Sequence, residues 1–447
     1  MRPGTDDPAT SQDSIARGRA APADVAPPQR IPLPTRHSIG YLLPEFPSQT
    51  HAFFWRELAA LEMLGVDAQI ISTRRPDAGE RCHQWAAQAS RRTIYLFPPG
   101  MRGLAAAGLM MRACPDGVGE CLRAALGAGG RGCSRVRMMG LIAMGARLSG
   151  IAQRIGLGHI HVHSCADAAF IAMFSNMMGG PPYSLTLHGD ADDYGAGQAL
   201  KWGHAAFGFV VTSALLPGLH RAAPGLDDSK VLVAPMGVDI ERFTRGRPYP
   251  PARRGPARVV CCGRLNRAKG QVELVRAAAA LRSVGIEAEV RLIGDGPARA
   301  LVEREIRRLA LTGRALVLGA LPESRVREEL EGAHVFALPS HAEALGVATM
   351  EAMAMGVPVV VSAVGGVPGL VRHGVDGLLV PARDEGALVE ALREVLGNPA
   401  EARRMGESGA GRIREYFHSG VSASRLTAVL DTLYGSEPEP GLAARRG

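Results

Sequence analysis

Lysine and aromatic residues are scarce in this chain, and both shortages narrow its possible functions. Of the 51 lysines and arginines among 447 residues, three are lysine (Lys201, Lys230 and Lys269), and aromatic residues make up 5%. No stripe of aromatic residues interleaved with basic ones runs along the sequence, which argues against a nucleic-acid-binding surface. No apolar run reaches the length that a bilayer-spanning helix needs. The length and the 46% of hydrophobic residues instead predict an α/β protein of two or three domains.

The cysteines show neither a disulfide nor a zinc-site spacing. There are seven, an odd number, and no CxxC pair occurs. This usage favours reduced thiols and a cytoplasmic protein without a zinc site. The first residues lack the apolar core of a signal peptide, so we expect no export. Residues 1–35 are rich in Pro, Ala, Arg and Asp and are expected to be disordered, as is the tail 436–447.

Positive charge is concentrated in one part of the chain. The net charge is +8, and between Arg91 and Gly158 there are ten arginines but only two acids, Asp116 and Glu120. Apolar stretches at 104–111 and 138–144 alternate with these arginines. Such a segment either docks on an anionic membrane surface or forms an ordinary helical layer with its arginines in water. We favour the membrane surface.

Two series of apolar runs separated by helical stretches predict two parallel sheets. The first series has strands near 38–43, 66–72, 93–97, 159–163, 183–187, 207–211 and 231–234. The second has strands near 258–262, 289–293, 315–318, 334–338, 357–361 and 378–380. We predict a first Rossmann-like domain over 36–244, a linker over 245–256 and a second such domain over 257–415. In sheets of this kind ligands bind at the carboxyl ends of the strands.

The segment 340–361 is the most informative part of the sequence. It places Glu343 before a predicted helix, 347–355, and Glu351 inside it, with a stop signal at Gly356 and Pro358. A helix N-terminus offers free N–H groups to a diphosphate, and a carboxylate accepts two hydrogen bonds from neighbouring sugar hydroxyls. The pattern therefore indicates a nucleotide-sugar site. The alternative is an amphipathic helix with one solvated glutamate and one that favours the helix dipole.

This segment resembles the Glu-x7-Glu signature of retaining GT-B glycosyltransferases, in particular family four. The resemblance covers about residues 38–435, and the "FPSQT" and "PMGVD" segments look most like the exopolysaccharide and colanic-acid branch. It implies two Rossmann-like domains with a cleft between them, and a helix at 416–435 that packs back on the first domain. It implies that Glu351 holds the ribose of the donor nucleotide and that Glu343 lies near the transferred sugar. The donor contacts that it implies around them include Leu345, Gly346 and Val347.

A second motif, "GRLNRAKG", follows the first strand of the second domain and resembles the family's diphosphate-binding element. Carried over, Arg264 and Lys269 bind the donor diphosphate. Two fixed cations suit a leaving group that develops negative charge. The alternative is a basic turn after a strand. The turn with Gly294 and Gly296 resembles "GxGP", whose loop lies against the nucleotide, and the "GGxPE" element has Gly369 in place of its glutamate.

The first domain carries histidine motifs at the ends of two predicted strands. His161 and His163 match the family's "HxH" element, and His188 matches "THGxD", whose histidine lines the donor-sugar pocket. His161 and His163 could equally be core histidines bonded to backbone. His163, with Ser48 and Thr50 of the first loop, is predicted on the acceptor side, and either hydroxyl could cap the following helix.

The cluster Asp190, Asp192 and Asp193 mimics the DxD metal motif of the other large glycosyltransferase fold, but we interpret it as an acidic loop. We expect neither a metal nor another cofactor.

These motifs predict a retaining hexosyltransferase that is peripheral at the inner face of the plasma membrane. Its partners would be a nucleotide-sugar donor, a saccharide or lipid-linked saccharide acceptor and an anionic membrane surface. The catalytic group would be Glu343, His188, Arg264 and Lys269. A phosphorylase, an epimerase and a non-catalytic scaffold use the same frame and stay open as alternatives. A phosphorylase is disfavoured because no pyridoxal-lysine signature is present, and a scaffold would not need these charged residues.

Overall fold

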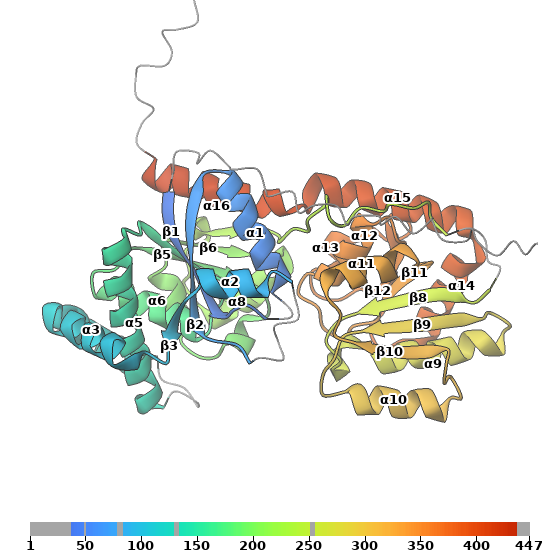
Figure 1. Ribbon diagram of the computed structural model, residues 1–447, viewed down its shortest axis with the longest axis horizontal. Coiled ribbons are helices and arrows are strands. Elements are labelled where there is room, and N and C mark those ends of the chain that lie inside the picture. The colour runs from blue at the N-terminus through green and yellow to red at the C-terminus, as the bar shows by residue number, and fades with distance from the viewer. Residues whose placement is uncertain (1–36, 49–50, 78–83, 129–133, 251–254, 436–447) are drawn as a thin grey trace, which may run out of the picture. The chain divides into compact units, whose positions relative to one another are not determined.

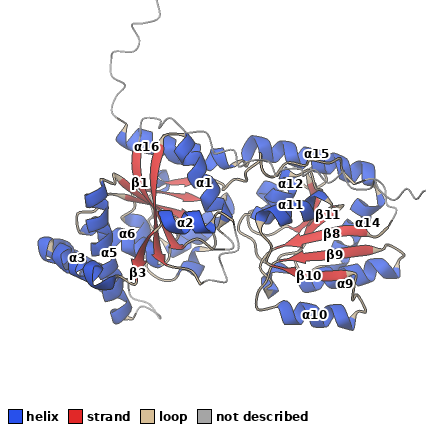
Figure 2. Cartoon of the chain, in the orientation of Figure 1, coloured by secondary structure: helices blue, strands red, loops and turns tan. Residues whose placement is uncertain are grey.

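A computed structural model of the chain describes residues 37–48, 51–77, 84–128, 134–250 and 255–435 (Figure 1). The predicted tails 1–35 and 436–447 lie outside the described residues, as does part of the predicted linker. Most strands are separated by helices along the chain, in agreement with the two predicted series (Figure 2).

The first sheet has seven parallel strands in the order β3-β2-β1-β4-β5-β6-β7. They are β1 (His37–Glu45), β2 (Val66–Arg74), β3 (Ile94–Phe97), β4 (His159–Val162), β5 (Tyr183–Leu187), β6 (Phe207–Val210) and β7 (Val231–Val233). Each lies within two residues of its predicted bounds.

The second sheet has six parallel strands in the order β10-β9-β8-β11-β12-β13. They are β8 (Ala257–Cys262), β9 (Ala288–Ile293), β10 (Ala315–Gly319), β11 (Val335–Leu338), β12 (Val359–Ser362) and β13 (Gly377–Val380). The prediction began β12 two residues early. Gly356 adopts a left-handed φ of 64° and the Val357 N–H bonds to the Ala352 carbonyl, so Val357 belongs to the end of the preceding helix.

Helices fill the connections in both halves. Those of the first half are α1 (Ala52–Met63), α2 (Ala86–Arg92), α3 (Gly100–Ala113), α4 (Pro115–Gly127), α5 (Arg135–Ile155), α6 (Asp167–Met177), α7 (Gln198–Gly203) and α8 (Leu216–Ala222). Those of the second are α9 (Gln271–Ser283), α10 (Arg299–Arg308), α11 (Glu323–Glu331), α12 (Val347–Ala354), α13 (Val367–Leu370), α14 (Glu385–Gly397), α15 (Pro399–Tyr416) and α16 (Ser419–Tyr434).

The strand order of each sheet reverses direction at one place. In the first sheet the reversal lies between β1 and β4, and in the second between β8 and β11. At such a switch point the loops leaving the two strands diverge and open a crevice at the carboxyl ends. The loops after β1, β4, β8 and β11 carry most of the predicted site residues, so the topology itself gathers them at two crevices.

Alternation along β1 shows how the first sheet is covered on both faces. Ile39, Tyr41 and Leu43 belong to one buried cluster, whereas Leu42 between them belongs to another. The first cluster also contains Phe54 of α1 and Leu426 of α16. The last helix therefore packs beside α1 on one face of the first sheet (Figure 1).

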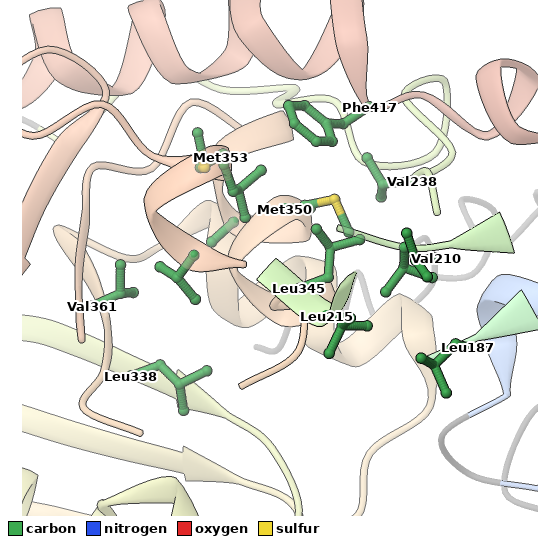
Figure 3. Packing of buried hydrophobic residues seen from close by; sticks show 14 of the residues in the cluster. Leu187, Val210, Leu215, Val238, Leu338, Leu345, Met350, Met353, Val361 and Phe417 are labelled. Carbon is green, nitrogen blue, oxygen red and sulfur yellow. The ribbon is translucent and has the colours of Figure 1, made fainter. Parts of the chain in front are cut away.

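The other cluster contains buried residues of both sheets. Its members include Leu187 and Val210 of the first sheet and Leu338 and Val361 of the second. Leu345 and Met350, from the loop and helix that carry the two glutamates, belong to it as well (Figure 3). Burial of this apolar area favours one fixed position for α12.

The segment between α15 and α16 is bound to the chain before the predicted linker. The Val238 N–H donates to the Phe417 carbonyl over 2.9 Å, and the Ser419 N–H donates to the Val238 carbonyl over 2.9 Å. A Cβ on Gly237 would lie 2.2 Å from the His418 backbone, so a glycine is required for this approach. The "PMGVD" segment thus has a structural role in the fold.

The arginine-rich segment forms α3, α4 and α5. Met101 and Leu109 on α3 and Val136 on α5 are large apolar side chains exposed to solvent. Among the residues that the structure describes, no helix is both long and apolar enough to cross a membrane.

Candidate functional site

The loop after β8 is held in place by glycines that let other loops approach its backbone. A Cβ on Gly270 would lie 2.0 Å from the Pro339 carbonyl oxygen, and one on Gly294 would lie 2.1 Å from that of Gly263. Both glycines have positive φ, at 68° and 133°. The β8 loop is thereby fixed between the loop after β9 and the loop after β11.

This packing brings Lys269 to Glu343. The Lys269 Nζ lies 2.5 Å from Glu343 Oε2, and the Ser340 hydroxyl lies 3.4 Å from the same oxygen. Both charged side chains are largely but not fully covered. A cation and an anion 74 positions apart in sequence are therefore paired at the switch point of the second sheet.

The glycine pair of the "GGxPE" element holds the Glu343 loop. A Cβ on Gly365 would lie 1.8 Å from the Glu343 carbonyl oxygen, and the Gly366 N–H donates to the Ala344 carbonyl over 2.9 Å. Gly369, where the family motif has glutamate, is exposed and has open space around it. The glycines of the motif therefore act through the backbone at the site, whereas position 369 lies on the surface.

Glu351 of α12 is paired with an arginine from the first half of the chain. The Arg56 guanidinium of α1 donates from Nη2 to Glu351 Oε1 over 2.9 Å and to Glu323 Oε2 over 3.0 Å. Burial raises the pKa of the Glu323 carboxyl, but the guanidinium groups of Arg56 and Arg242 outweigh it and hold that pKa below its usual value. Neither Arg56 nor Glu323 was predicted from the sequence.

A cavity of about 190 Å³ lies at this ion-pair network. It is lined by Ala52, Phe53, Arg56, Phe243, Cys262, Gly263, Arg264, Ile293, Gly294, Leu321, Glu323, Val326, Val347, Ala348 and Glu351. We call it the donor pocket. Its walls are mostly apolar, with charged groups at Arg56, Arg264, Glu323 and Glu351. Such a lining suits a flat ring with polar edges.

The predicted donor residues other than Lys269 and Glu343 divide into two groups. Arg264, Gly294, Val347 and Glu351 line the donor pocket. Leu345 is buried in the hydrophobic core, so its side chain is not available to a ligand. Gly346 begins α12 with a φ of 86°, and Gly296 packs against the Leu265 backbone, where a Cβ would lie 2.4 Å from the carbonyl oxygen. These three positions shape the loops around the pocket.

Two of the three residues predicted on the acceptor side lie within the described part of the chain. Thr50 lies outside the described residues. Ser48 does not cap the next helix: α1 begins after His51 without a side-chain cap, and Ser48 instead accepts the His51 N–H through its carbonyl. The prediction that Ser48 caps α1 was therefore wrong. His163 is buried, and its ring faces protein groups.

Those groups form a buried chain of ionisable side chains. The Tyr41 hydroxyl donates to Glu57, and His163 Nε2 lies 3.2 Å from the same Glu57 oxygen. His163 Nδ1 lies 3.1 Å from His188 Nε2. Burial raises the pKa of the Glu57 carboxyl, but the His163 ring and the Tyr41 hydroxyl outweigh it and lower that pKa to about 2. With Glu57 ionised, a proton on His163 Nε2 faces it, and His163 Nδ1 and His188 Nε2 share one hydrogen bond.

The remaining histidine of the "HxH" element is a core residue bonded to side chains. His161 contacts the Ser184 hydroxyl over 2.7 Å and the Thr186 hydroxyl over 3.0 Å. The alternative of a buried histidine holds for it, although its partners are hydroxyls and not backbone. Burial lowers the pKa of His161 well below its usual value.

No group of three or more His, Cys, Asp or Glu side chains suited to a metal ion occurs within the described ranges. Asp190 precedes a short 3₁₀ turn, Ala191–Tyr194, that contains Asp192 and Asp193. The interpretation of these aspartates as an acidic loop stays a prediction.

Comparisons with known proteins identify the family. The profile of "Glycosyl transferases group 1" matches residues 247–412, which contain β8 to β13 and the donor pocket loops. The colanic acid biosynthesis glycosyltransferase WcaL of Salmonella typhimurium is 35% identical over 38% of this chain and 43% of its own length. The chain spans about half of the length of WcaL and of three other similar proteins, between 43% and 58%.

Two further proteins extend the likeness beyond the second sheet. The alpha-maltose-1-phosphate synthase of Mycolicibacterium smegmatis is 31% identical over 58% of this chain and 74% of its own length. The structure of Anabaena HepE in complex with UDP-glucose has a TM-score of 0.67, at 16% identity over 88% of this chain and 99% of HepE. The two parallel sheets and this likeness confirm the predicted GT-B fold. The chain belongs to the glycosyl transferases of group 1.

Proposed function

We propose that this chain is a retaining hexosyltransferase that uses a nucleotide diphosphate sugar. Its product would be an exopolysaccharide or another cell-envelope glycan. The observation that carries the proposal is the Lys269–Glu343 pair, 2.5 Å apart at the switch point of the second sheet, beside a pocket that contains Glu351. The names of WcaL, a colanic acid biosynthesis glycosyltransferase, and of HepE with UDP-glucose support the product class and the donor class.

The charged residues suit the departure of a nucleoside diphosphate. Lys269 has three N–H donors, so it can stay bonded to Glu343 while it donates to a phosphate oxygen. Arg264, on the same loop, supplies a second cation as the bond between sugar and diphosphate breaks and negative charge grows on the leaving oxygen. Glu343 accepts hydrogen bonds from sugar hydroxyls. No protein base is assigned, because the departing diphosphate oxygen can take the proton of the acceptor hydroxyl on the same face of the sugar.

The donor pocket must widen to accept the whole donor. At about 190 Å³ it is smaller than the roughly 300–1,000 Å³ of typical ligand sites. Its wall includes Ala52, Phe53 and Arg56 of α1, so a small movement of α1 away from α12 would enlarge it. Return of α1 over the bound donor would exclude water and limit hydrolysis.

The acceptor in this proposal is a saccharide or a lipid-linked saccharide at the cytoplasmic membrane surface. The exposed apolar side chains of α3 and α5 and the neighbouring arginines support it, since lipid headgroups attract the charge and the acyl region takes apolar tips. A groove of about 360 Å³ between α3 and α5 is lined by Phe97, Leu104, Leu141 and Met144. The protein would be peripheral at this surface.

The test of the donor site is thermal stabilisation by UDP-, GDP- and ADP-sugars, each at about 100-fold above its dissociation constant. The melting temperature is measured for the wild type, Lys269→Ala and Arg267→Ala. Arg267 is the control, because it lies exposed in the same turn without contact to Glu343. We expect one nucleotide class to raise the melting temperature of the wild type and of Arg267→Ala but not of Lys269→Ala. Stabilisation by none of them would overturn the transferase proposal in favour of a non-catalytic scaffold.

A further inference from the structure

Arg56 is an arginine of the first half of the chain that lies inside a pocket built mainly by the second. Its side chain is 4% exposed, and the guanidinium carbon lies 4.8 Å from the centre of the Phe243 ring. One nitrogen, Nη2, bonds to both Glu351 and Glu323. Burial alone would lower the pKa of Arg56, but the two carboxylates outweigh it, so the group is a buried cation.

The hydrogen-bonding capacity of Arg56 is only partly used. Its Nε and Nη1 are buried and have no hydrogen-bond partner among the described residues. Buried guanidinium donors are normally satisfied, and an unmet pair in the wall of a cavity indicates a ligand with acceptor atoms. The donor pocket is the cavity that Arg56 lines.

The neighbours of Arg56 indicate which part of a nucleotide it would meet. Glu323 and Glu351 lie within 3.0 Å of its Nη2, and two carboxylates would repel a diphosphate brought to the same place. Lys269 and Arg264, which suit the diphosphate, belong instead to the β8 loop. Apolar side chains of Phe53, Phe243 and Leu321 in the pocket wall suit a nucleobase face.

We propose that Arg56 is a nucleotide-binding residue that α1 supplies to the nucleoside end of the donor site, where it donates to uncharged acceptor oxygens of the ribose and base. In the free protein Arg56 holds Glu351 in place. When the ribose hydroxyls take Glu351, the guanidinium keeps Glu323 and turns its unused N–H groups to the nucleoside. This inference rests on the proposed function, because it assumes that the pocket binds a nucleotide.

The opposite role makes an opposite prediction. If Arg56 only stabilised the contact between α1 and α12, it would compete with the ribose for Glu351. Its removal would then leave nucleotide affinity unchanged or raise it, and only the melting temperature would fall. The sign of the change in affinity therefore separates the two roles.

The experiment measures dissociation constants of UMP, UDP, GMP, GDP, AMP and ADP by calorimetry for wild type, Arg56→Met and Lys269→Ala. Arg242→Met is the matched control, since Arg242 also contacts Glu323, at 3.6 Å, but is largely exposed and does not line the pocket. We expect Arg56→Met to weaken the monophosphate and the diphosphate of the preferred base by the same factor, about tenfold or more. Lys269→Ala should weaken the diphosphate far more than the monophosphate, and Arg242→Met should weaken neither.

A further variant guards against misfolding. Arg56→Met removes the cation that Glu351 and Glu323 share, so the double variant Arg56→Met/Glu323→Gln, which removes one negative charge as well, is measured beside it. Unchanged or tighter nucleotide binding in a folded Arg56 variant would overturn this inference alone. Failure of the wild type to bind any of the six nucleotides would overturn the proposed function together with it.

Discussion

Buried histidines make the fold sensitive to mild acid. Burial lowers the pKa of His159 and of His188 to about 3, with the charges of His37 and His163 adding to the effect. At a pH below about 6.5, the pKa of a histidine in the unfolded chain, these histidines bind protons in the unfolded chain but stay neutral in the folded protein. Their stabilising contribution is therefore complete above about pH 6.5 and declines as the pH falls from about 6.5 towards about 3.

We expect the melting temperature to fall by about 5 °C or more between pH 7.5 and pH 5, since each such histidine costs about 2 kcal/mol at pH 5. Scanning fluorimetry across this range measures it. The effect of Glu57 is separate, because a carboxyl whose folded pKa is about 2 loses its contribution only below about pH 4.5. A melting temperature that is flat from pH 7.5 to 5 would show that these histidines are not buried as described.

Two glycines four positions apart provide a matched test of the Glu343 loop. A Cβ on Gly365 would lie 1.8 Å from the Glu343 carbonyl oxygen at a φ of 53°, whereas nothing lies within 4 Å of one on Gly369. We expect Gly365→Ala to lower the free energy of unfolding by about 2 kcal/mol or more and to weaken donor binding at least about tenfold. Gly369→Ala should stay within about 0.5 kcal/mol of wild type. Equal effects in denaturant titrations would contradict the tight loop packing.

The site residues differ in how far sequence reveals them. Glu343, Glu351, Arg264 and Lys269 sit in short motifs, so their loops could be predicted. The role of Arg56 could not be predicted, because its partner Glu351 lies 295 positions away in the sequence. In its own segment Arg56 looks like an ordinary polar residue of an amphipathic helix. Glu57 looks equally ordinary, and only the fold shows it beside His163.

At the scale of elements, the helices α3 and α5 carry the strongest surface prediction. Met101, Leu109 and Val136 are 84%, 71% and 82% exposed, among arginines. We expect the triple substitution of these residues by Asp to weaken binding to vesicles containing anionic phosphatidylglycerol by about tenfold or more, because it removes apolar contact and adds negative charge. Co-sedimentation with the vesicles measures this.

The control introduces an aspartate at an exposed apolar position elsewhere on the chain. Val284→Asp alters an exposed apolar residue, 61% exposed, on the second half of the chain and should leave vesicle binding unchanged. Equal sedimentation of the triple variant and the wild type would show that the α3 and α5 face is an ordinary solvated helical layer.

The strands were predicted more completely than the helices. A buried parallel strand is a short apolar run whose limits the sequence displays, and Tyr183–Leu187 was predicted to the residue. The long helix α15 escaped individual prediction, because small and charged residues dominate it and only one face is buried.

At the scale of the whole molecule, parallel strand order explains why so distant residues meet. The reversals between β1 and β4 and between β8 and β11 gather loops at the carboxyl ends of both sheets. The alternating pattern predicts parallel sheets in general but not the order of their strands. The contacts of α1 with α16 and of Arg56 with Glu351 depend on tertiary packing. The family resemblance, not the spacing, was the source of the predicted return of the last helix.

The measurement that tests the central claim most directly is release of nucleoside diphosphate from the stabilising nucleotide sugar, with a membrane extract as acceptor. We predict turnover by the wild type and by the control Arg267→Ala, and a loss of about 100-fold or more in Lys269→Ala, because the leaving diphosphate loses its cation. Full turnover by Lys269→Ala, or none by the wild type with any of the donors, would contradict the account.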